Sequence, residues 1–387
     1  MPEIWIPYGE VEVAVDIKAE NLAEVLNPDV PKLDDEILYE RLDSVETEGK
    51  SIILLADITN ATLKVLTSLL DLQIEKGKSQ NDFTVSVHKD SLYTVKRAFK
   101  DRPIDIIPIG EADKEVGIVD GYKVRVPTPF FRNKMIIISE VGFDPLFGFG
   151  GGPVSIIKAT DSGFIAEAFK RRLDNHPKPG LDTKPALFAS KLIEEADLHA
   201  SASIEVLNRS GDVSELFLGD IMDTHSKASS KLYESAKRVL KQPARVMLVG
   251  LGDPLKSLTL SSSIRSLWNV VGGLDKKGMV VLFAECSEGL GSEALKLFVT
   301  DRLNVDEFIK RRDYVEGLED LIYLKNNLQK HNMMLTSSLP YYYTEKLGLR
   351  TSKKASDILN HILQELGRRT KILLISDALN ILPTIQS

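Results

Sequence analysis

Residues 148–152 hold the pattern in this chain that is best suited to binding an anion. Four of these five residues are glycine and the fifth is Phe149, so the backbone can approach a ligand closely. The apolar residues 135–141 before them are typical of a buried strand, and Pro153 after them suits the first turn of a helix. A strand, a glycine loop and a helix start predict a cradle in which backbone amides and the helix dipole face a phosphate or a carboxylate.

The same glycines have a second interpretation, a turn that lets a strand meet a helix, and the sequence alone leaves both open. No lysine adjoins the glycines, so they do not form a Walker loop, and they match the dinucleotide fingerprint poorly. If the first interpretation holds, the loop and the helix after it contact a ligand or cofactor. The residues predicted to do so are Gly148, Phe149, Gly150, Gly151, Gly152, Ser155 and Lys158.

The chain has six histidines, and no two of them have the spacing of a helical zinc motif. His88 directly follows residues 83–87, which are typical of a strand, and ligands often bind at strand ends. His176 lies in a turn-rich segment and is also a candidate for a functional role. His225 is expected to be an exposed polar residue, and His361 is expected to have a structural role beside an apolar helix stripe.

Short apolar runs that end in a carboxylate recur along the chain. Such runs, alternating with helical segments, predict parallel sheets covered by helices on both faces. The carboxyl ends of parallel strands line the ligand crevice, so the carboxylates that follow these runs are candidates for a site. They are Asp57, Asp253, Glu285 and Asp377. Thr59, just after the first of them, either contacts a substrate or caps the next helix.

These patterns predict an α/β fold with two α/β domains, mainly parallel sheets and a cleft between the domains. The expected domains are residues 1–240, which contain the glycine loop, and residues 241–387. Residues 3–17 alternate apolar and polar side chains around a Pro-Tyr-Gly turn and predict an opening hairpin. Residues 190–240 are expected to form a long helical region that leads into the second domain.

Composition restricts the classes of partner. The chain has 387 residues and a net charge of −7, with 49 Lys and Arg against 56 Asp and Glu. This balance argues against broad binding of nucleic acid or of a membrane surface. No apolar run reaches the ~18 residues that a membrane span needs, and the first residues do not resemble a signal peptide. Cys286 is the single cysteine, which excludes an intrachain disulfide and favours a cytoplasmic protein.

Several motifs occur in an order that resembles the nickel-dependent lactate racemase family along essentially the whole chain. The motifs that carry the resemblance are Pro7-Tyr8-Gly9, Asp57-Ile58-Thr59-Asn60, the segment from Gly142 to Ser155, Asn175-His176, Gly252-Asp253-Pro254-Leu255 and the segment from Cys286 to Glu293. The resemblance implies a two-domain α/β protein with its active site between the domains. It also implies a nickel-pincer nucleotide tethered to a lysine, a histidine that coordinates nickel, and two histidines that exchange protons with the hydroxyl of a 2-hydroxy acid.

Position by position, the resemblance assigns roles to individual residues. His176 falls at the nickel ligand, and His88 falls near one of the two catalytic histidines. Leu146 falls at the other catalytic histidine and Val154 falls at the tether lysine, so neither position can supply the family's chemistry. Lys158, one helical turn further along, is a shifted tether candidate.

The substrate contacts that the resemblance implies are altered as well. Asn60 stands where the family has an arginine that pairs with the substrate carboxylate, a role that a guanidinium fills best. Lys256 and Ser257 stand where the family has an Asp-Gln pair. The residues predicted to bind substrate are Asp57, Thr59, Asn60, Lys256 and Ser257.

Two functions remain open on these residues. The first is a divergent racemase or epimerase of 2-hydroxy acids that handles the nickel-pincer nucleotide differently, for example without a covalent bond. The second is a non-catalytic or regulatory homologue that binds an anion or a nucleotide, with Lys158, Lys178 or Lys256 supplying positive charge. Both predict a small-molecule anion or hydroxy acid as the ligand, and neither predicts nucleic acid or a membrane as a partner.

Overall fold

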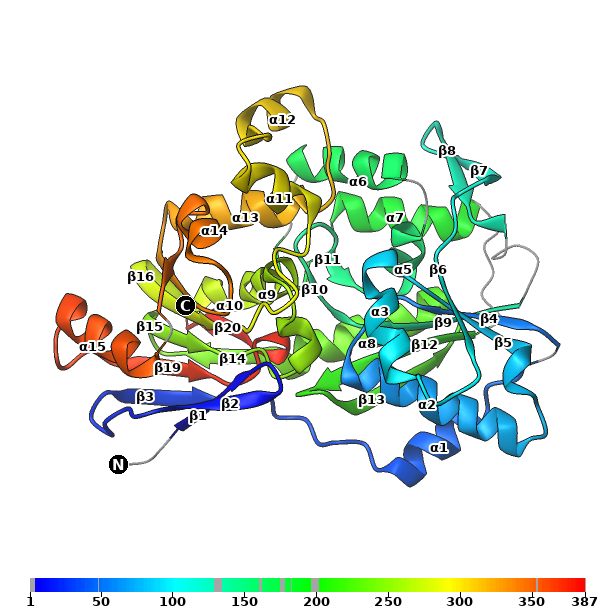
Figure 1. Cartoon of the computed structure of the whole chain (residues 1–387), viewed down its shortest axis with the longest axis horizontal. Helices are drawn as coiled ribbons and strands as arrows, with labels where there is room; N and C mark the ends of the chain where they lie inside the picture. The colour runs from blue at the N-terminus through cyan, green and yellow to red at the C-terminus, as the bar shows by residue number, and fades with distance from the viewer. Residues whose placement is uncertain are drawn as a thin grey trace. The chain divides into compact units, whose positions relative to one another are not determined.

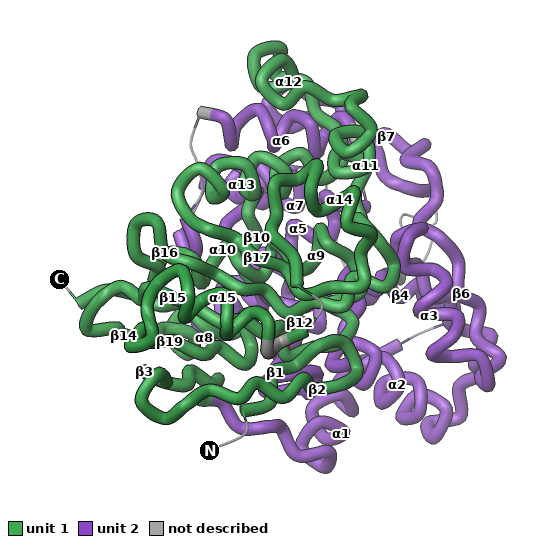
Figure 2. The backbone as a smooth tube through the Cα atoms, turned by 60° about the vertical axis from the view of Figure 1, so that its left-hand side comes forward, with its two compact units in different colours: residues 1–29, 143–145, 233–387 green, residues 30–142, 146–232 purple. Residues whose placement is uncertain are grey.

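Two six-stranded sheets, each built mainly from parallel strands, form the frame of the protein. The computed structural model describes residues 4–47, 49–128, 134–159, 162–174, 178–181, 183–195, 202–352 and 354–386. Figure 1 shows the order of the elements along the chain, and Figure 2 colours the two compact units into which the chain divides. Unit 1 consists of Met1–Asp29, Phe143–Pro145 and Tyr233–Ser387, and unit 2 consists of Val30–Gly142 and Leu146–Leu232. The prediction of an α/β fold with mainly parallel sheets is confirmed.

The sheet of unit 2 has the strand order β13-β12-β9-β4-β5-β6, and β13 is its one antiparallel strand. These strands are β4 (Ser51–Leu55), β5 (Phe83–Val87), β6 (Asp105–Pro108), β9 (Lys134–Glu140), β12 (Ala202–Arg209) and β13 (Asp212–Gly219). Unit 2 also contains β7 (Lys114–Val119), β8 (Tyr122–Val126), β11 (Gly148–Gly150), α1 (Asp35–Asp43), α2 (Asn60–Glu75), α3 (Leu92–Ala98), α5 (Gly152–Lys158), α6 (Ser162–Asp174), α7 (Lys184–Glu195) and most of α8 (Ile221–Ala236). The last residues of α8 belong to unit 1, and β10 (Gly142–Asp144) lies where the chain passes between the units.

The two faces of this sheet differ in chemistry. On one face, Ile53, Ile136 and Ile204 pack with apolar residues of α1 and α2 into a buried core. Successive strand side chains point to opposite faces, so Ser139 and Glu205, which are paired in the register of β9 and β12, lie on the other face. The helices α5 and α7 lie on the opposite side of this sheet from α1 and α2 (Figure 1). Ser139 and Glu205 therefore lie on the face of the sheet that is covered by α5, the helix that follows the glycine loop.

The sheet of unit 1 is wholly parallel, with the strand order β18-β17-β16-β15-β19-β3. Its strands are β3 (Leu22–Leu26), β15 (Ala244–Val249), β16 (Leu274–Phe283), β17 (Asn332–Thr336), β18 (Arg350–Thr351) and β19 (Ile372–Ile375). The other elements are β1 (Ile4–Tyr8), β2 (Val11–Val15), β14 (Lys237–Leu240), β20 (Leu382–Ile385), α9 (Leu260–Arg265), α10 (Leu267–Val270), α11 (Glu293–Val299), α12 (Val305–Arg311), α13 (Leu318–Leu328), α14 (Tyr341–Lys346) and α15 (Ala355–Leu366). One core of this unit joins the apolar stripe of α15 to the β1–β2 hairpin and the sheet.

The structure changes two expectations about organisation. The predicted opening hairpin is present as β1 and β2, but Met1–Asp29 cluster with the C-terminal residues rather than with residues 30–142. The long helix expected over residues 190–240 is wrong, because residues 202–219 form the antiparallel pair β12–β13. The turn between these strands uses Ser210 and Gly211, whose φ angles are +50° and +89°, a conformation that ends any helix.

Within the described residues, no helix has both the length and the apolar character required to cross a bilayer.

Candidate functional site around the glycine loop

The backbone conformation of the glycine loop requires glycine at three of its positions. Gly148, Gly151 and Gly152 have φ angles of +92°, +92° and +45°, a region that side chains with a Cβ rarely adopt. A Cβ at Gly148 would lie 2.6 Å from the carbonyl oxygen of Leu181. The adjoining Thr183 fixes the loop by donating its hydroxyl to the carbonyl of Phe147 at 2.7 Å. The loop is therefore held tightly within unit 2.

Two amides at the start of α5 already have partners. The amide of Gly152 donates to Ser139 Oγ at 3.2 Å, and that of Val154 donates to the carbonyl of Gly151 at 3.0 Å. Pro153 between them has no amide to donate. These positions do not offer an anion the free N–H groups of a phosphate cradle, so the loop's binding role stays a prediction.

A carboxylate and an imidazole occupy the space beside the loop. A Cβ at Gly151 would collide with Glu205 Oε1, and one at Gly152 would lie 2.6 Å from the Cβ of His225. Glu205 Oε1 and His225 Nδ1 are 2.9 Å apart. The loop therefore packs closely on a Glu205–His225 pair, which we call the dyad.

The dyad is buried at its carboxylate end and accessible at its imidazole end. The Glu205 side chain is fully buried, whereas 19% of the His225 side chain is exposed. Burial raises the pKa of Glu205, His225 opposes this shift, and the charge of Asp57 adds to it. Glu205 Oε2 is buried with no hydrogen-bond partner, and His225 Nε2 has none among the described residues. The expectation that His225 is an exposed polar residue is wrong, because Glu205 draws the ring against β12.

The predicted substrate residues at the end of β4 are arranged as a helix start. Thr59 is the N-cap of α2, and it forms a capping box with Thr62. Asn60 is the first residue of this helix. Asp57 Oδ2 accepts a hydrogen bond from the amide of Glu140 at 3.2 Å. The structure thus accounts for Thr59 by capping alone, which was the alternative left open by the sequence.

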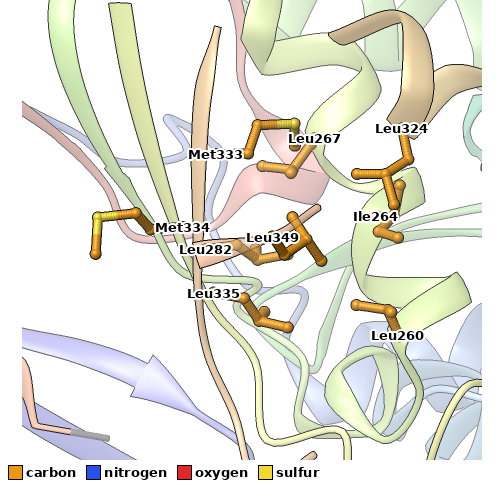
Figure 3. A pocket seen from close by; sticks show the side chains of 9 residues that line it. All are labelled: Leu260, Ile264, Leu267, Leu282, Leu324, Met333, Met334, Leu335 and Leu349. Carbon is orange, nitrogen blue, oxygen red and sulfur yellow. The ribbon is translucent and has the colours of Figure 1, made fainter. Parts of the chain in front are cut away.

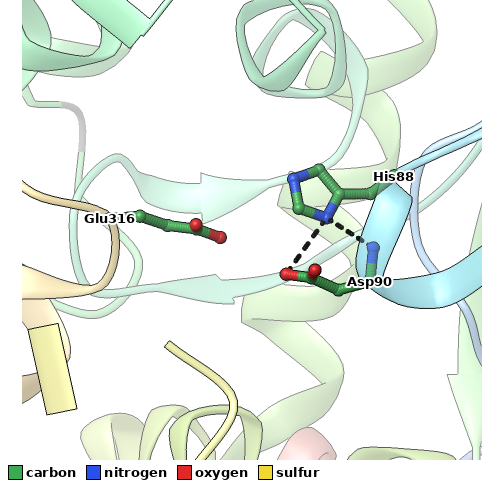
Figure 4. Close-up of side chains that lie close together, drawn as sticks. All are labelled: His88, Asp90 and Glu316. Carbon is green, nitrogen blue, oxygen red and sulfur yellow. Dashed lines mark hydrogen bonds and ion pairs between the residues drawn. The ribbon is translucent and has the colours of Figure 1, made fainter. Parts of the chain in front are cut away.

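His88 lies at the end of β5, as the sequence predicts. It begins the short 3-10 helix Lys89–Ser91, and its Nδ1 accepts from the amide of Asp90 at 3.4 Å and lies 3.6 Å from Asp90 Oδ2 (Figure 4). The His88 side chain is 41% exposed. These are local contacts, so its catalytic role stays a prediction.

The other residues singled out in and near the glycine loop are buried, half-buried or outside the described residues. Ser155 is buried in α5, and Lys158 is half-buried at the end of that helix. Val154 and Leu146 are buried, with 2% and 3% of their surfaces exposed. His176, the predicted nickel ligand, lies outside the described residues.

In unit 1, the residues predicted to bind substrate follow β15. Asp253 caps a short helical turn, Pro254–Ser257, by accepting from the amide of Leu255 at 2.9 Å. The hydroxyl of Ser257 is buried with no hydrogen-bond partner, and Lys256 precedes it in the same turn. Ser257 is 1% exposed, so its role in binding a ligand stays a prediction.

Cys286, which follows β16, is a buried residue with a poorly ionised thiol. Burial raises the pKa of its thiol to about 12, and the side chain is buried. A thiol in this state does not supply the thiolate that nucleophilic catalysis requires. Cys286 is therefore excluded as a nucleophile.

A second buried ionic group, in unit 1, was not predicted from the sequence. Arg265 at the end of α9 donates its Nε to Asp320 Oδ1 at 2.9 Å and its Nη2 to Glu319 Oε1 at 3.0 Å. Ser261 Oγ donates to Asp320 Oδ2 at 2.5 Å. Burial, together with the charge of Asp320, raises the pKa of Glu319 to about 7. We call this group the arginine cluster.

An apolar cavity lies between α9, α13 and the sheet of unit 1 (Figure 3). Its volume is about 10 Å³, and its lining includes Leu260, Ile264 and Leu324. A space of this size holds at most one water, and water needs polar partners. The cavity is a packing gap and not a ligand site.

Comparison with solved structures places this architecture among known folds. A lactate racemase apoprotein from Thermoanaerobacterium thermosaccharolyticum is similar over the full length of both chains, with 17% identity and a TM-score of 0.77. The fold is lactate-racemase-like. A protein from Thermotoga maritima is also similar, with 12% identity, a TM-score of 0.69, and coverage of 93% of this chain and 100% of the other. No protein-family model matches the sequence, and no curated protein matches it.

The motif resemblance assigns Val154 to the position of the tether lysine and Leu146 to the position of a catalytic histidine, and neither residue fits that chemistry. The tether requires an amine, and Val154 is apolar and 2% exposed. Leu146, where a catalytic histidine is expected, has no group that exchanges a proton and is 3% exposed.

Proposed function

We propose that this chain is a lactate-racemase-like protein that binds a small hydroxy acid, or a related anion, without a covalently attached nickel-pincer nucleotide. The observation that carries the proposal is the buried, apolar Val154 in the glycine loop. A covalent bond to the cofactor needs a nucleophilic nitrogen, and a valine side chain supplies none. Lys158 lies one turn further along α5, on the same face of the helix, so its amine is displaced along the helix axis from the Val154 position.

The ligand class rests on the fold and on the polar groups at the strand ends. The similarity to a lactate racemase apoprotein makes a hydroxy acid the first ligand to test. Ser257 contributes a buried hydroxyl that lacks a hydrogen-bond partner, and its neighbour Lys256 contributes a cation. A buried polar group without a partner costs about 1–3 kcal/mol, so a ligand that satisfies it gains affinity.

An active racemase or epimerase of 2-hydroxy acids with altered cofactor handling is the second candidate. Two imidazoles of unit 2 favour it, because inversion at a hydroxyl-bearing carbon needs groups that exchange protons. His88 has a side chain that is 41% exposed, and His225 keeps an imidazole nitrogen without a partner among the residues described here. This candidate requires a hydride acceptor that the protein binds without a covalent bond to residue 154.

The experiment that separates these candidates is calorimetric titration of the purified chain with L-lactate and D-lactate, with propionate as a control that lacks the hydroxyl. Each enantiomer is also incubated with the chain and analysed by chiral chromatography for conversion into the other enantiomer. We expect saturable binding of lactate without interconversion. Interconversion of the enantiomers would establish the second candidate instead, and no binding of either enantiomer would overturn the proposal.

A further inference from the structure

We infer that His225 is a proton-exchanging ligand contact beside the glycine loop, that Glu205 is its positioning residue, and that the ligand presents a hydroxyl group to it. This inference deepens the proposed function, since the ligand class rests on it. The residues themselves come from the structure of unit 2, because neither was a candidate in the sequence.

Four elements converge to build the dyad. Glu205 lies on β12 beside Ser139 of β9, and Ser139 accepts the amide of Gly152 from the loop. His225 lies in the first turns of α8, where Asp220 accepts the amide of Met222 at 2.9 Å and so fixes the helix start. A sheet, a capped helix and a tight loop together hold the imidazole in one place.

The hydrogen bond to Glu205 fixes the tautomer of the imidazole. A carboxylate oxygen accepts, so Nδ1 of His225 carries the proton that it shares with Glu205 Oε1 at 2.9 Å. The lone pair of a neutral ring then resides on Nε2. This nitrogen is the atom that can accept a proton from a ligand, and the carboxylate stabilises the resulting imidazolium.

The unsatisfied atoms show that the arrangement is incomplete without a ligand or a water. Glu205 Oε2 is buried with no hydrogen-bond partner, and a buried carboxylate oxygen in that state is unusual in native proteins. The Nε2 of His225 likewise has no partner in the part of the chain that the structure describes. A pair with a purely structural role would be expected to use its polar atoms internally.

Charge selects the chemical group that faces His225. Burial raises the pKa of Glu205, the charge of Asp57 adds to this shift, and His225 opposes it. An anionic carboxylate or phosphate placed at the ring would face both carboxylates and be repelled. A neutral hydroxyl avoids this repulsion and donates its hydrogen to Nε2.

The proton transfer balances without any further reactant. The O–H bond of the ligand breaks, an N–H bond forms at Nε2, and the electron pair of the broken bond stays on the ligand oxygen. Glu205 keeps its hydrogen bond to Nδ1–H and takes no proton. The reverse step returns the proton to the same oxygen, so nothing is oxidised or reduced.

The test is ¹⁵N NMR of the full chain labelled at histidine, which distinguishes protonated from unprotonated ring nitrogens. We expect His225 in its neutral form to carry its proton on Nδ1 alone. In Glu205→Gln, whose amide both donates and accepts, we expect a mixture of the two tautomers. A wild-type ring protonated at Nε2, or an unchanged single tautomer in the variant, would overturn the positioning role of Glu205.

The same samples are then titrated with L-lactate, D-lactate and propionate. Lactate should shift the Nε2 signal of His225 and propionate should not, and His225→Gln should weaken lactate binding about tenfold. His361→Gln is the matched control, because His361 also pairs with a carboxylate, Glu365, at 2.8 Å, but lies on α15. Lactate binding that leaves the Nε2 signal unchanged would overturn this inference while sparing the proposed function. Absence of lactate binding would overturn the proposed function and the ligand class inferred here.

Discussion

The dyad of unit 2 and the arginine cluster of unit 1 use the same ingredients to different ends. Each pairs buried carboxylate with a single side chain that carries nitrogen donors. In the arginine cluster, the guanidinium of Arg265 bonds two carboxylates through two of its nitrogens. In the dyad, one ring nitrogen of His225 is bonded and the other is left over. Burial of charge alone therefore does not mark a functional site, and the oriented ring with an unused nitrogen is the feature that separates the dyad from the arginine cluster.

The largest effect is expected from removing the cation of the arginine cluster. Arg265→Met leaves Glu319 and Asp320 as buried carboxylates without a cation, which should lower the free energy of unfolding by about 3–5 kcal/mol. Urea unfolding followed by circular dichroism measures it. The control is Arg350→Met, because Arg350 is 51% exposed where it pairs with Glu365, and its loss should cost at most about 1 kcal/mol. Equal losses of unfolding free energy in the two variants would show that the arginine cluster is no more important for stability than an exposed ion pair.

The pH dependence of stability should carry the signature of Glu319. Its pKa is raised from 4.5 to about 7 in the folded protein, so the folded state binds the proton more tightly than the unfolded state. The contribution of Glu319 to the free energy of unfolding is fully present below pH 4.5, which is the pKa of this side chain in the unfolded state. It falls by about 1.4 kcal/mol for each pH unit above that value and is lost above about pH 7. The total loss is about 3 kcal/mol.

Glu319→Gln should remove this slope between about pH 5 and pH 7, because glutamine does not titrate. Urea midpoints recorded across that range for the wild type and the variant test it. If the stability of the variant still falls with pH over the same range, another group causes the fall, and the raised pKa of Glu319 in the arginine cluster is contradicted.

Close packing of the loop on the dyad should appear in a pair of glycine substitutions. Gly151 and Gly77 have φ angles of +92° and +86°, so alanine strains the backbone at both, by about 1–3 kcal/mol. A Cβ at Gly77 meets nothing within 4 Å, whereas one at Gly151 collides with Glu205. Gly151→Ala should therefore lose about 2 kcal/mol more than Gly77→Ala in thermal or urea unfolding. Equal losses would show that the loop does not rest on Glu205.

The smallest effect separates a capping residue from a ligand contact. Thr59→Ala removes the N-cap of α2 and should cost about 1 kcal/mol of stability, while Thr59→Ser should restore it. Lactate affinity, measured by calorimetry, should not change in either variant. A loss of lactate affinity in Thr59→Ala without a loss of stability would return Thr59 to the predicted substrate site.

Local patterns predicted much of the fold. The apolar runs that became β4 and β15, and the alternation that became the β1–β2 hairpin, each specify a strand within a few residues. The glycines of residues 148–152 were correctly singled out as backbone requirements, since three of them have positive φ. These features depend on neighbours in sequence, which a single chain displays.

The dyad could not be predicted in the same way. Glu205 and His225 are 20 residues apart, and their contact depends on which face of β12 turns toward α8. The region was expected to be helical, so the alternation of Ser203 and Glu205 with the apolar Ile204 and Val206 was overlooked. That alternation, with a carboxylate inside an otherwise apolar strand, was the available signal.

The glycine loop packs on the dyad, and we propose that it carries no covalent cofactor. This proposal is tested most directly by the intact mass and nickel content of the chain after co-expression with the enzymes that synthesise the nickel-pincer nucleotide. We expect the mass of the unmodified 387-residue chain and no stoichiometric nickel. A mass increased by the cofactor, with the adduct mapped by peptide analysis to Lys158 and with one nickel per chain, would contradict the proposal.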